Sequence, residues 1–169
     1  MKNKSLVIVC GDPESTFNEI LIKTIKSKFF NTFKFPVIIV CSKKLFLKEL
    51  SKLKKKINLE TFDYQKKLNK KNIYFIDVPL NLKKLSLIKK NSYITKSFEI
   101  GLNLLKRINS VGLINGPISK TNFLRGRYNG MTEFFAAKTR SSNEVMLIFN
   151  KQLSVSPITT HIHLQSSNI

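Results

Sequence analysis

The sequence predicts an α/β protein built on a mostly parallel sheet, and two patterns predict it. Short continuous apolar runs recur along the chain, each ended by glycine, proline or a polar turn, as in strands buried on both faces. Amphipathic stretches separate these runs, as in helices that cover a sheet. Alternation of the two indicates right-handed crossover connections. The predicted strands are residues 6–10, 37–41, 73–78 and 111–114.

The first two strands are each followed by a predicted helix. Thr16 and Glu19 have the spacing of a capping box, and the amphipathic pattern behind them runs to about Phe30. A second, lysine-rich helix is predicted over residues 43–54. Residues 57–72 show no pattern that separates strand from loop.

A long helix precedes the fourth strand. Residues 80–91 are predicted as an irregular loop, and Ser92 can cap a helix that ends near Ile108. The predicted inner face of this helix consists of Ile94, Phe98, Gly101, Leu105 and Ile108.

The last quarter of the chain is predicted as a helix followed by a hairpin. The helix begins near Thr132, and two strands, residues 144–149 and 153–160, are joined by a turn at Asn150 and Lys151. Residues 1–169 show no internal repeat and no linker, so we expect a single α/β lobe.

Length and composition restrict the class of protein. A chain of 169 residues can bury a core of its own. No apolar run reaches the roughly 18 residues of a membrane span, and the run behind the N-terminus is too short for a secretory signal. We therefore expect a cytoplasmic protein without a membrane partner, in which Cys10 and Cys41 are reduced and packed rather than bridged.

The formal net charge of +20 raises the possibility of a nucleic-acid-binding module. Lysine supplies nearly all of the excess and is scattered along the chain, whereas base readers and phosphate clamps favour arginine. The charge is therefore interpreted mainly as a compositional bias, which would still attract an anionic substrate. Nucleic acid is kept as an alternative partner rather than the expected one.

Three loops lie where predicted strands end, which is where ligands bind in parallel α/β sheets. They are residues 11–13, 115–120 and 159–161. The chain contains neither GxGxxG nor a Walker A loop, so neither common nucleotide cradle is predicted.

These loops and one further segment resemble the motifs of a known family. Gly11-Asp12-Pro13 is similar to the start of a GDPAGIGPE-type loop, and residues 116–120 (GPISK) to GP-x-x-K. Residues 130–136 (GMTEFFA) resemble a GHTEF block, and residues 159–164 (TTHIHL) resemble T-x-H-x-P-L. In this order and spacing the chain resembles the 4-hydroxythreonine-4-phosphate dehydrogenase family over almost its whole length.

The resemblance implies a fold, an activity and an assembly. The implied fold is the three-layer α/β/α arrangement of isocitrate and isopropylmalate dehydrogenases, here its N-terminal portion. The implied activity is NAD-dependent oxidation of 4-phosphohydroxy-L-threonine with decarboxylation, in vitamin B6 (pyridoxal phosphate) biosynthesis. The implied assembly is a homodimer with a divalent metal (Zn, Mg or Co) between its subunits.

The resemblance also assigns the metal ligand. His161 matches the family's first metal-binding histidine, and a neutral imidazole suits such a cation. The cation would act as a Lewis acid on the substrate oxygen as hydride and proton leave. His163 stands where the family has proline, so it is interpreted as incidental.

Four other residues are candidates for contacting the substrate or shaping its site. Thr132 matches a substrate-contacting threonine, although it could instead be a plain helix N-cap. Met131 stands where the family has a substrate-contacting histidine, and a thioether cannot donate a hydrogen bond. Lys120 could meet a phosphate, and Asp12 is expected to cap a turn.

The family is close to twice this length, and its NAD site and remaining metal ligands lie in the second half. We therefore expect this chain to be inactive alone and to expose apolar surface that the second half would cover. A fragment of a longer protein is the favoured interpretation, with a split gene or a decayed remnant as alternatives. Because Met131 stands where the family has histidine, a related metal-dependent hydroxy-acid dehydrogenase with a different substrate is kept as an alternative function.

Overall fold

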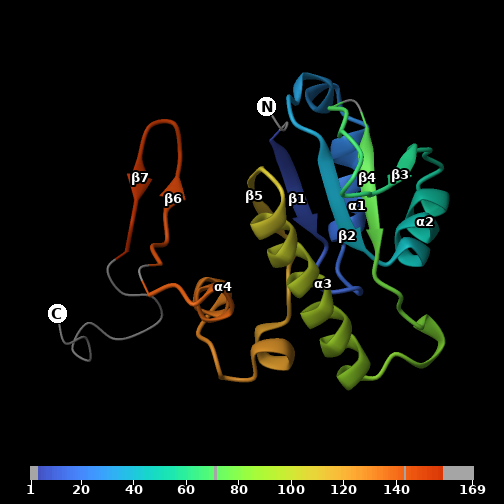
Figure 1. Cartoon of the computed structure of the whole chain (residues 1–169). Helices are drawn as coiled ribbons and strands as arrows, with labels where there is room; N and C mark the ends of the chain where they lie inside the picture. Colours follow the sequence, from blue (N-terminus) through green and yellow to red (C-terminus); the bar gives the residue numbers. More distant parts are fainter. Residues whose placement is uncertain (1–3, 71, 143, 158–169) are drawn as a thin grey trace, which may run out of the picture. The chain divides into compact units, whose positions relative to one another are not determined.

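The computed structural model describes residues 4–70, 72–142 and 144–157. The chain divides into two units, Met1–Ile118 and Ser119–Ile169. Among the described residues, the first unit contains a five-stranded sheet and the helices that cover it, and the second contains one α-helix and a short hairpin (Figure 1).

All strand pairs in the sheet of the first unit are parallel, and the strand order is β3-β4-β2-β1-β5. The strands are β1 (Ser5–Val9), β2 (Val37–Cys41), β3 (Leu59–Thr61), β4 (Ile73–Asp77) and β5 (Ser110–Asn115). The four predicted strands are confirmed, and β3 is an addition that the sequence pattern did not reveal. Every residue of β2 is buried, as expected of a central strand covered on both faces.

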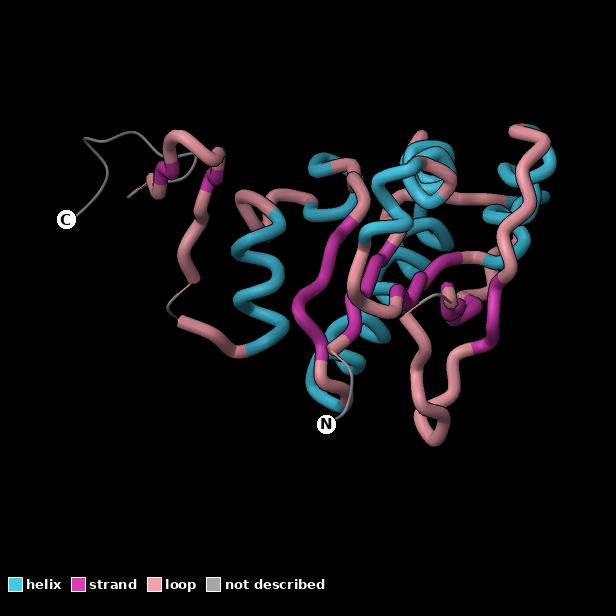
Figure 2. Tube along the Cα trace, turned by 90° about the horizontal axis from the view of Figure 1, so that it is seen from above, coloured by secondary structure: helices cyan, strands magenta, loops and turns pink. Residues whose placement is uncertain are grey.

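Helices cover both faces of this sheet (Figures 1 and 2). α1 (Phe17–Ile25) and α2 (Lys43–Lys52) pack against one face, where Ile22 and Phe46 join Ile39 in one apolar cluster. α3 (Leu87–Arg107) contacts β1, β2 and β5 on the other face. The predicted three-layer α/β/α arrangement is thereby confirmed.

Two helix boundaries in the first unit differ from prediction. α1 ends at Ile25 rather than near Phe30, and a 3-10 helix, η1 (Lys28–Thr32), follows it. Thr16 is the N-cap but makes no side-chain cap hydrogen bond, so the predicted capping box is absent. Glu19 instead pairs with Lys23 one turn along, at 2.6 Å, and this lowers the pKa of the carboxyl.

α3 begins six residues earlier than predicted, with Ser86 rather than Ser92 as its N-cap, so the loop assignment for residues 80–91 was wrong in part. The Ser86 side chain accepts a hydrogen bond from the Lys89 amide at 3.4 Å and caps the helix. A short 3-10 helix, η2 (Leu82–Lys84), precedes it. The inner face holds Leu104, which is fully buried, rather than the partly exposed Leu105.

β5 differs from prediction in its burial. It pairs with β1 alone and so forms one edge of the sheet within the described residues. Val111 is 43 % exposed and Ile114 45 %, although the continuous apolar run predicted a strand buried on both faces. An apolar run therefore indicated the strand correctly but not its position in the sheet.

The second unit has a small aromatic core. α4 (Met131–Thr139) follows a short π-helical turn, η3 (Lys120–Leu124). Phe134, which is buried, contacts the rings of Phe123, Tyr128 and Phe135.

A hairpin of two short strands, β6 (Ile148–Phe149) and β7 (Ser154–Val155), completes the described part of the second unit. Its two strands are antiparallel, as predicted, but each has two residues rather than the six to eight that the sequence indicated. The Asn150 amide donates to the carbonyl of Leu153 at 2.9 Å, which places the turn where it was predicted. Over the described residues, no helix is long and apolar enough to cross a membrane.

Candidate functional site

Two predicted motif loops meet at the carboxyl ends of β1 and β5. These strands are neighbours in register, with Val9 opposite Asn115, so the residues after them leave the sheet side by side. The amide of Gly116 donates to the carbonyl of Val9 at 2.7 Å, and the amide of Asp12 donates to the carbonyl of Pro117 at 2.9 Å. The Gly-Asp-Pro loop and the Gly-Pro loop are thus joined through their backbones.

Glycine is required at both loops because the two backbones approach so closely. A Cβ on Gly116 would lie 2.1 Å from the carbonyl oxygen of Cys10, and one on Gly11 would lie 2.5 Å from that of Pro117. Gly11 also has a φ of +71°, a conformation that L side chains rarely adopt. The glycines of the two motifs therefore have one shared physical cause, which is the packing of one loop on the other.

Asp12 uses both carboxylate oxygens to hold its loop. Oδ1 accepts from the Glu14 amide at 2.9 Å, which confirms the predicted turn-capping role. Oδ2 lies 2.9 Å from the Lys90 ammonium, an ion pair that the sequence did not predict. Lys90 also pairs with Glu14 at 2.6 Å.

This ion pair joins the first motif loop to the first turn of α3. The side chains of Lys90 and Asp12 are each 12 % exposed, whereas that of Glu14 is 64 % exposed. Burial alone would lower the pKa of Lys90, but its hydrogen bonds to Glu14 and Asp12 outweigh burial and raise the pKa. The ammonium is therefore charged at neutral pH.

A buried polar cluster lies at the carboxyl ends of β1 and β2. Cys41 Sγ donates to Asn18 Oδ1 at 3.5 Å and accepts from the Tyr93 hydroxyl at 3.7 Å, while the Ser42 amide donates to that hydroxyl at 3.0 Å. Burial raises the pKa of Tyr93, and the Cys41 thiol raises it further. This cluster connects α1, β2 and α3 close to the first motif loop.

Both cysteines are free and buried, as predicted. The hydrogen bond to Cys41 raises the pKa of Cys10, and burial raises it further. Cys10 is therefore a neutral thiol at physiological pH, which argues against a role as a nucleophile.

The third motif begins α4 in the second unit. Gly130 is the N-cap, so the interpretation of Thr132 as a plain N-cap is wrong. Met131 and Thr132 lie in the first turn and are partly buried. The amides of a helix's first turn favour an anion, so this position is compatible with the substrate contact predicted for Thr132.

The remaining predicted residues fall into two groups. Lys120 begins η3 and is exposed, and it follows Ser119, whose side chain accepts from the Asn122 amide at 3.3 Å. His161, His163 and the rest of the fourth motif lie outside the described residues. Within the described part, no three histidine, cysteine or acidic side chains gather as metal ligands, so the metal site stays a prediction.

Comparison with known proteins agrees with the motifs. A family model described as "Pyridoxal phosphate biosynthetic protein PdxA" matches residues 33–168. A 4-hydroxythreonine-4-phosphate dehydrogenase of Aquifex aeolicus is 28 % identical over an alignment 174 positions long, which covers 96 % of this chain and 51 % of that protein. The chain thus spans about half the length of the curated relative it matches.

Solved structures of the same name share the fold. The 4-hydroxythreonine-4-phosphate dehydrogenase of Klebsiella pneumoniae matches with a TM-score of 0.76 and 22 % identity, over 96 % of this chain and 52 % of that one. The enzyme of Burkholderia phymatum matches with a TM-score of 0.73 and 20 % identity, over 95 % of this chain and 51 % of that one.

Proposed function

Since the chain belongs to the PdxA family of pyridoxal phosphate biosynthetic proteins, we propose that it takes part in the NAD-dependent oxidation and decarboxylation of 4-phosphohydroxy-L-threonine. The observation that carries this proposal is the backbone junction between the first two motif loops at the carboxyl ends of β1 and β5. Parallel α/β sheets bind ligands at the carboxyl ends of their strands. The junction supports the proposal because the first two motifs, which are far apart in sequence, are joined through their backbones.

Each candidate residue has a proposed role in that reaction. Thr132, in the first turn of α4, would bind a polar or anionic group of the substrate, and Lys120 would add a positive charge for its phosphate. His161 would be one ligand of a divalent cation of the Zn, Mg or Co class. That cation, when bound, would stabilise negative charge on the substrate oxygen as hydride leaves the adjacent carbon.

We further propose that turnover needs sequence beyond this chain. The relatives are about twice as long, and one histidine ligand rarely holds a catalytic metal. The hairpin of the second unit supports this, because its large apolar side chains are exposed. They include Val145 (73 %), Leu147 (61 %), Phe149 (71 %) and Leu153 (67 %). The remaining sequence or a second copy in a homodimer would cover such a surface.

The test joins this chain to the complementary part of the Aquifex aeolicus relative. NADH formation from 4-phosphohydroxy-L-threonine is then followed at its absorbance maximum with Zn²⁺, Mg²⁺ or Co²⁺ present. We expect turnover from the fusion and none from the chain alone. A fusion that melts cooperatively but forms no NADH would overturn the proposed substrate.

Variants of the two histidines separate the metal ligand from its neighbour. His161→Ala should abolish NADH formation and weaken Co²⁺ binding measured by its visible absorbance, because an imidazole ligand is lost. His163→Ala should change both by less than twofold. Equal losses in the two variants would contradict the assignment of His161.

A further inference from the structure

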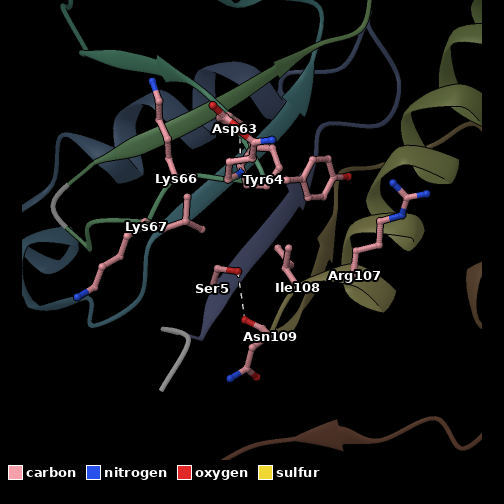
Figure 3. Close-up of a pocket in the computed structure, with 11 residues that line it drawn as sticks. Ser5, Asp63, Tyr64, Lys66, Lys67, Arg107, Ile108 and Asn109 are labelled. Atoms are coloured by element: carbon pink, nitrogen blue, oxygen red, sulfur yellow. Dashed lines mark hydrogen bonds between the residues drawn. The ribbon is translucent and has the colours of Figure 1, made fainter.

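A hollow of the first unit lies at the amino ends of the strands, the opposite end of the sheet from the motif loops. Figure 3 shows the side chains that line it. Its volume is about 570 Å³, within the range of small-molecule sites. Three segments line it: Ser5 at the start of β1, residues 62–68 after β3, and residues 107–109, which run from the last residue of α3 to the start of β5. Because Ser5 and Ser110 are paired at the amino ends of their strands, this hollow is separate from the proposed substrate site.

One wall of the hollow combines aromatic rings with an arginine. Phe62 and Tyr64 pack edge to face, with ring centroids 4.9 Å apart. The Arg107 guanidinium carbon lies 5.9 Å from the centre of the Tyr64 ring, and Figure 3 shows the two side chains facing each other. Tyr64 is 54 % exposed, so part of its ring surface is open to a ligand. An exposed ring beside a guanidinium suits a planar group that carries negative charge.

The charge around the hollow is positive. Its lining includes Lys66, Lys67 and Arg107 against the single acid Asp63, one oxygen of which already accepts from the Gln65 amide at 2.9 Å. In Figure 3 the two lysines extend away from the centre, so Arg107 is the labelled cation that faces the Tyr64 ring. The carboxyl end of α3 also lies here and disfavours an anion, but Lys106 and Arg107 in its last turn oppose that effect.

We propose that this hollow binds a small planar aromatic phosphate, with the ring against Tyr64 and the phosphate on Arg107. Ile108 also lines the hollow and supplies an apolar surface for the ring, whereas Ser5, another lining residue, is 1 % exposed and supports the wall. Ser5 is held in place because its hydroxyl donates to the carbonyl of Asn109 at 3.4 Å. The proposal concerns a binding site only and does not depend on the proposed dehydrogenase activity.

Calorimetric titration of the full chain with pyridoxine 5′-phosphate tests this proposal. The probe combines an aromatic ring with a phosphate and lacks an aldehyde that would react with the many lysines. We expect saturable binding at one site per chain. Pyridoxine, which lacks the phosphate, and inorganic phosphate, which lacks the ring, should each bind at least tenfold more weakly. No saturable binding at 5 mM probe, or equal binding of inorganic phosphate, would overturn the proposal.

Two variants locate the site, and one matched variant controls for charge. Arg107→Gln and Tyr64→Leu should each weaken binding of pyridoxine 5′-phosphate at least tenfold. Arg140→Gln removes the same charge from the end of α4 and should change binding by less than twofold. If Arg107→Gln fails to fold, Tyr64→Leu decides the outcome. Equal effects of the two arginine variants would show general attraction to a basic protein and overturn the site.

Discussion

The amide of Asp12 donates to the carbonyl of Pro117, and this bond joins two loops that lie more than 100 residues apart in sequence. The loops follow neighbouring strands, and glycine precedes the bonded residue in each of them. The geometry of the first motif therefore depends on the second, so changes in one loop should be transmitted to the other.

Gly11→Ala should destabilise the protein by more than the cost of its backbone conformation. An added Cβ would meet Pro117 O at 2.5 Å and Gly116 O at 2.8 Å. We expect a loss of roughly 3 kcal/mol or more in the free energy of unfolding, measured by urea denaturation, because overpacking against backbone adds to the strain of a positive φ.

Gly126 provides the matched control for this substitution. It has the same φ of +71°, but a Cβ there would meet no atom within 4 Å. Gly126→Ala should therefore cost only the conformational strain, about 1 kcal/mol. Equal costs in the two variants would show that the contact between the loops adds nothing.

Lys90→Met should reduce stability by about 1–2 kcal/mol near neutral pH, between the values typical of surface and buried pairs. Folding raises the pKa of this lysine, so its contribution is complete below the pKa of the unfolded state, about 10.4. The contribution is lost as the pH rises through the higher pKa of the folded state. The difference between wild type and variant should thus be constant from pH 7 to about 10 and shrink above it.

Lys89→Met is the control for this pH series, because Lys89 is the exposed neighbour on the same turn. Its unfolding free energy should stay within about 0.5 kcal/mol of wild type. If Lys90→Met showed the same small change and no pH dependence, the ion pair with Asp12 would make no net contribution.

The sequence predicted the sheet better than it predicted the helix ends. A strand's apolar run is a local property, and four of the five strands were found from it. The start of α3 is different, because its first turn carries Ile88, which is 75 % exposed, and has no apolar face to recognise. That turn is held instead by Ser86 and by the pairing of Lys90 with Asp12 and Glu14.

The same distinction applies to the candidate site. The glycine and proline residues of the motif loops were identified from the sequence, because they end apolar runs and match the family's motifs in order and spacing. The Lys90 pair was missed, because its partner Glu14 lies 76 residues away and lysine is abundant throughout the chain. The exposure of β5 was also missed, since the order of strands in a sheet depends on crossovers and not on any one strand.

Replacing apolar residues of the hairpin should reduce self-association of the isolated chain. In the double variant Leu147→Ser with Phe149→Ser, two side chains that are 61 % and 71 % exposed are removed. We expect the weight-average mass from sedimentation velocity to fall toward that of a monomer, because less apolar surface is exposed to water. Ile88→Ser, which removes a side chain that is 75 % exposed on α3, is the control and should leave the mass unchanged. A wild-type chain that is already monomeric would contradict this prediction.

Restoring histidine at position 131 tests whether the substrate is the one the resemblance implies. Met131 is partly buried in the first turn of α4, beside Thr132, and its thioether cannot donate the hydrogen bond that an imidazole can. In the fusion described above, Met131→His should raise kcat/KM for 4-phosphohydroxy-L-threonine by about tenfold, the effect of about 1.4 kcal/mol from one hydrogen bond to a charged group. Met146→His, on the exposed segment before β6, should leave kcat/KM unchanged. An unchanged or lower value for Met131→His would indicate that this site has diverged toward another hydroxy acid, and a panel of phosphorylated and unphosphorylated hydroxy acids would then identify it.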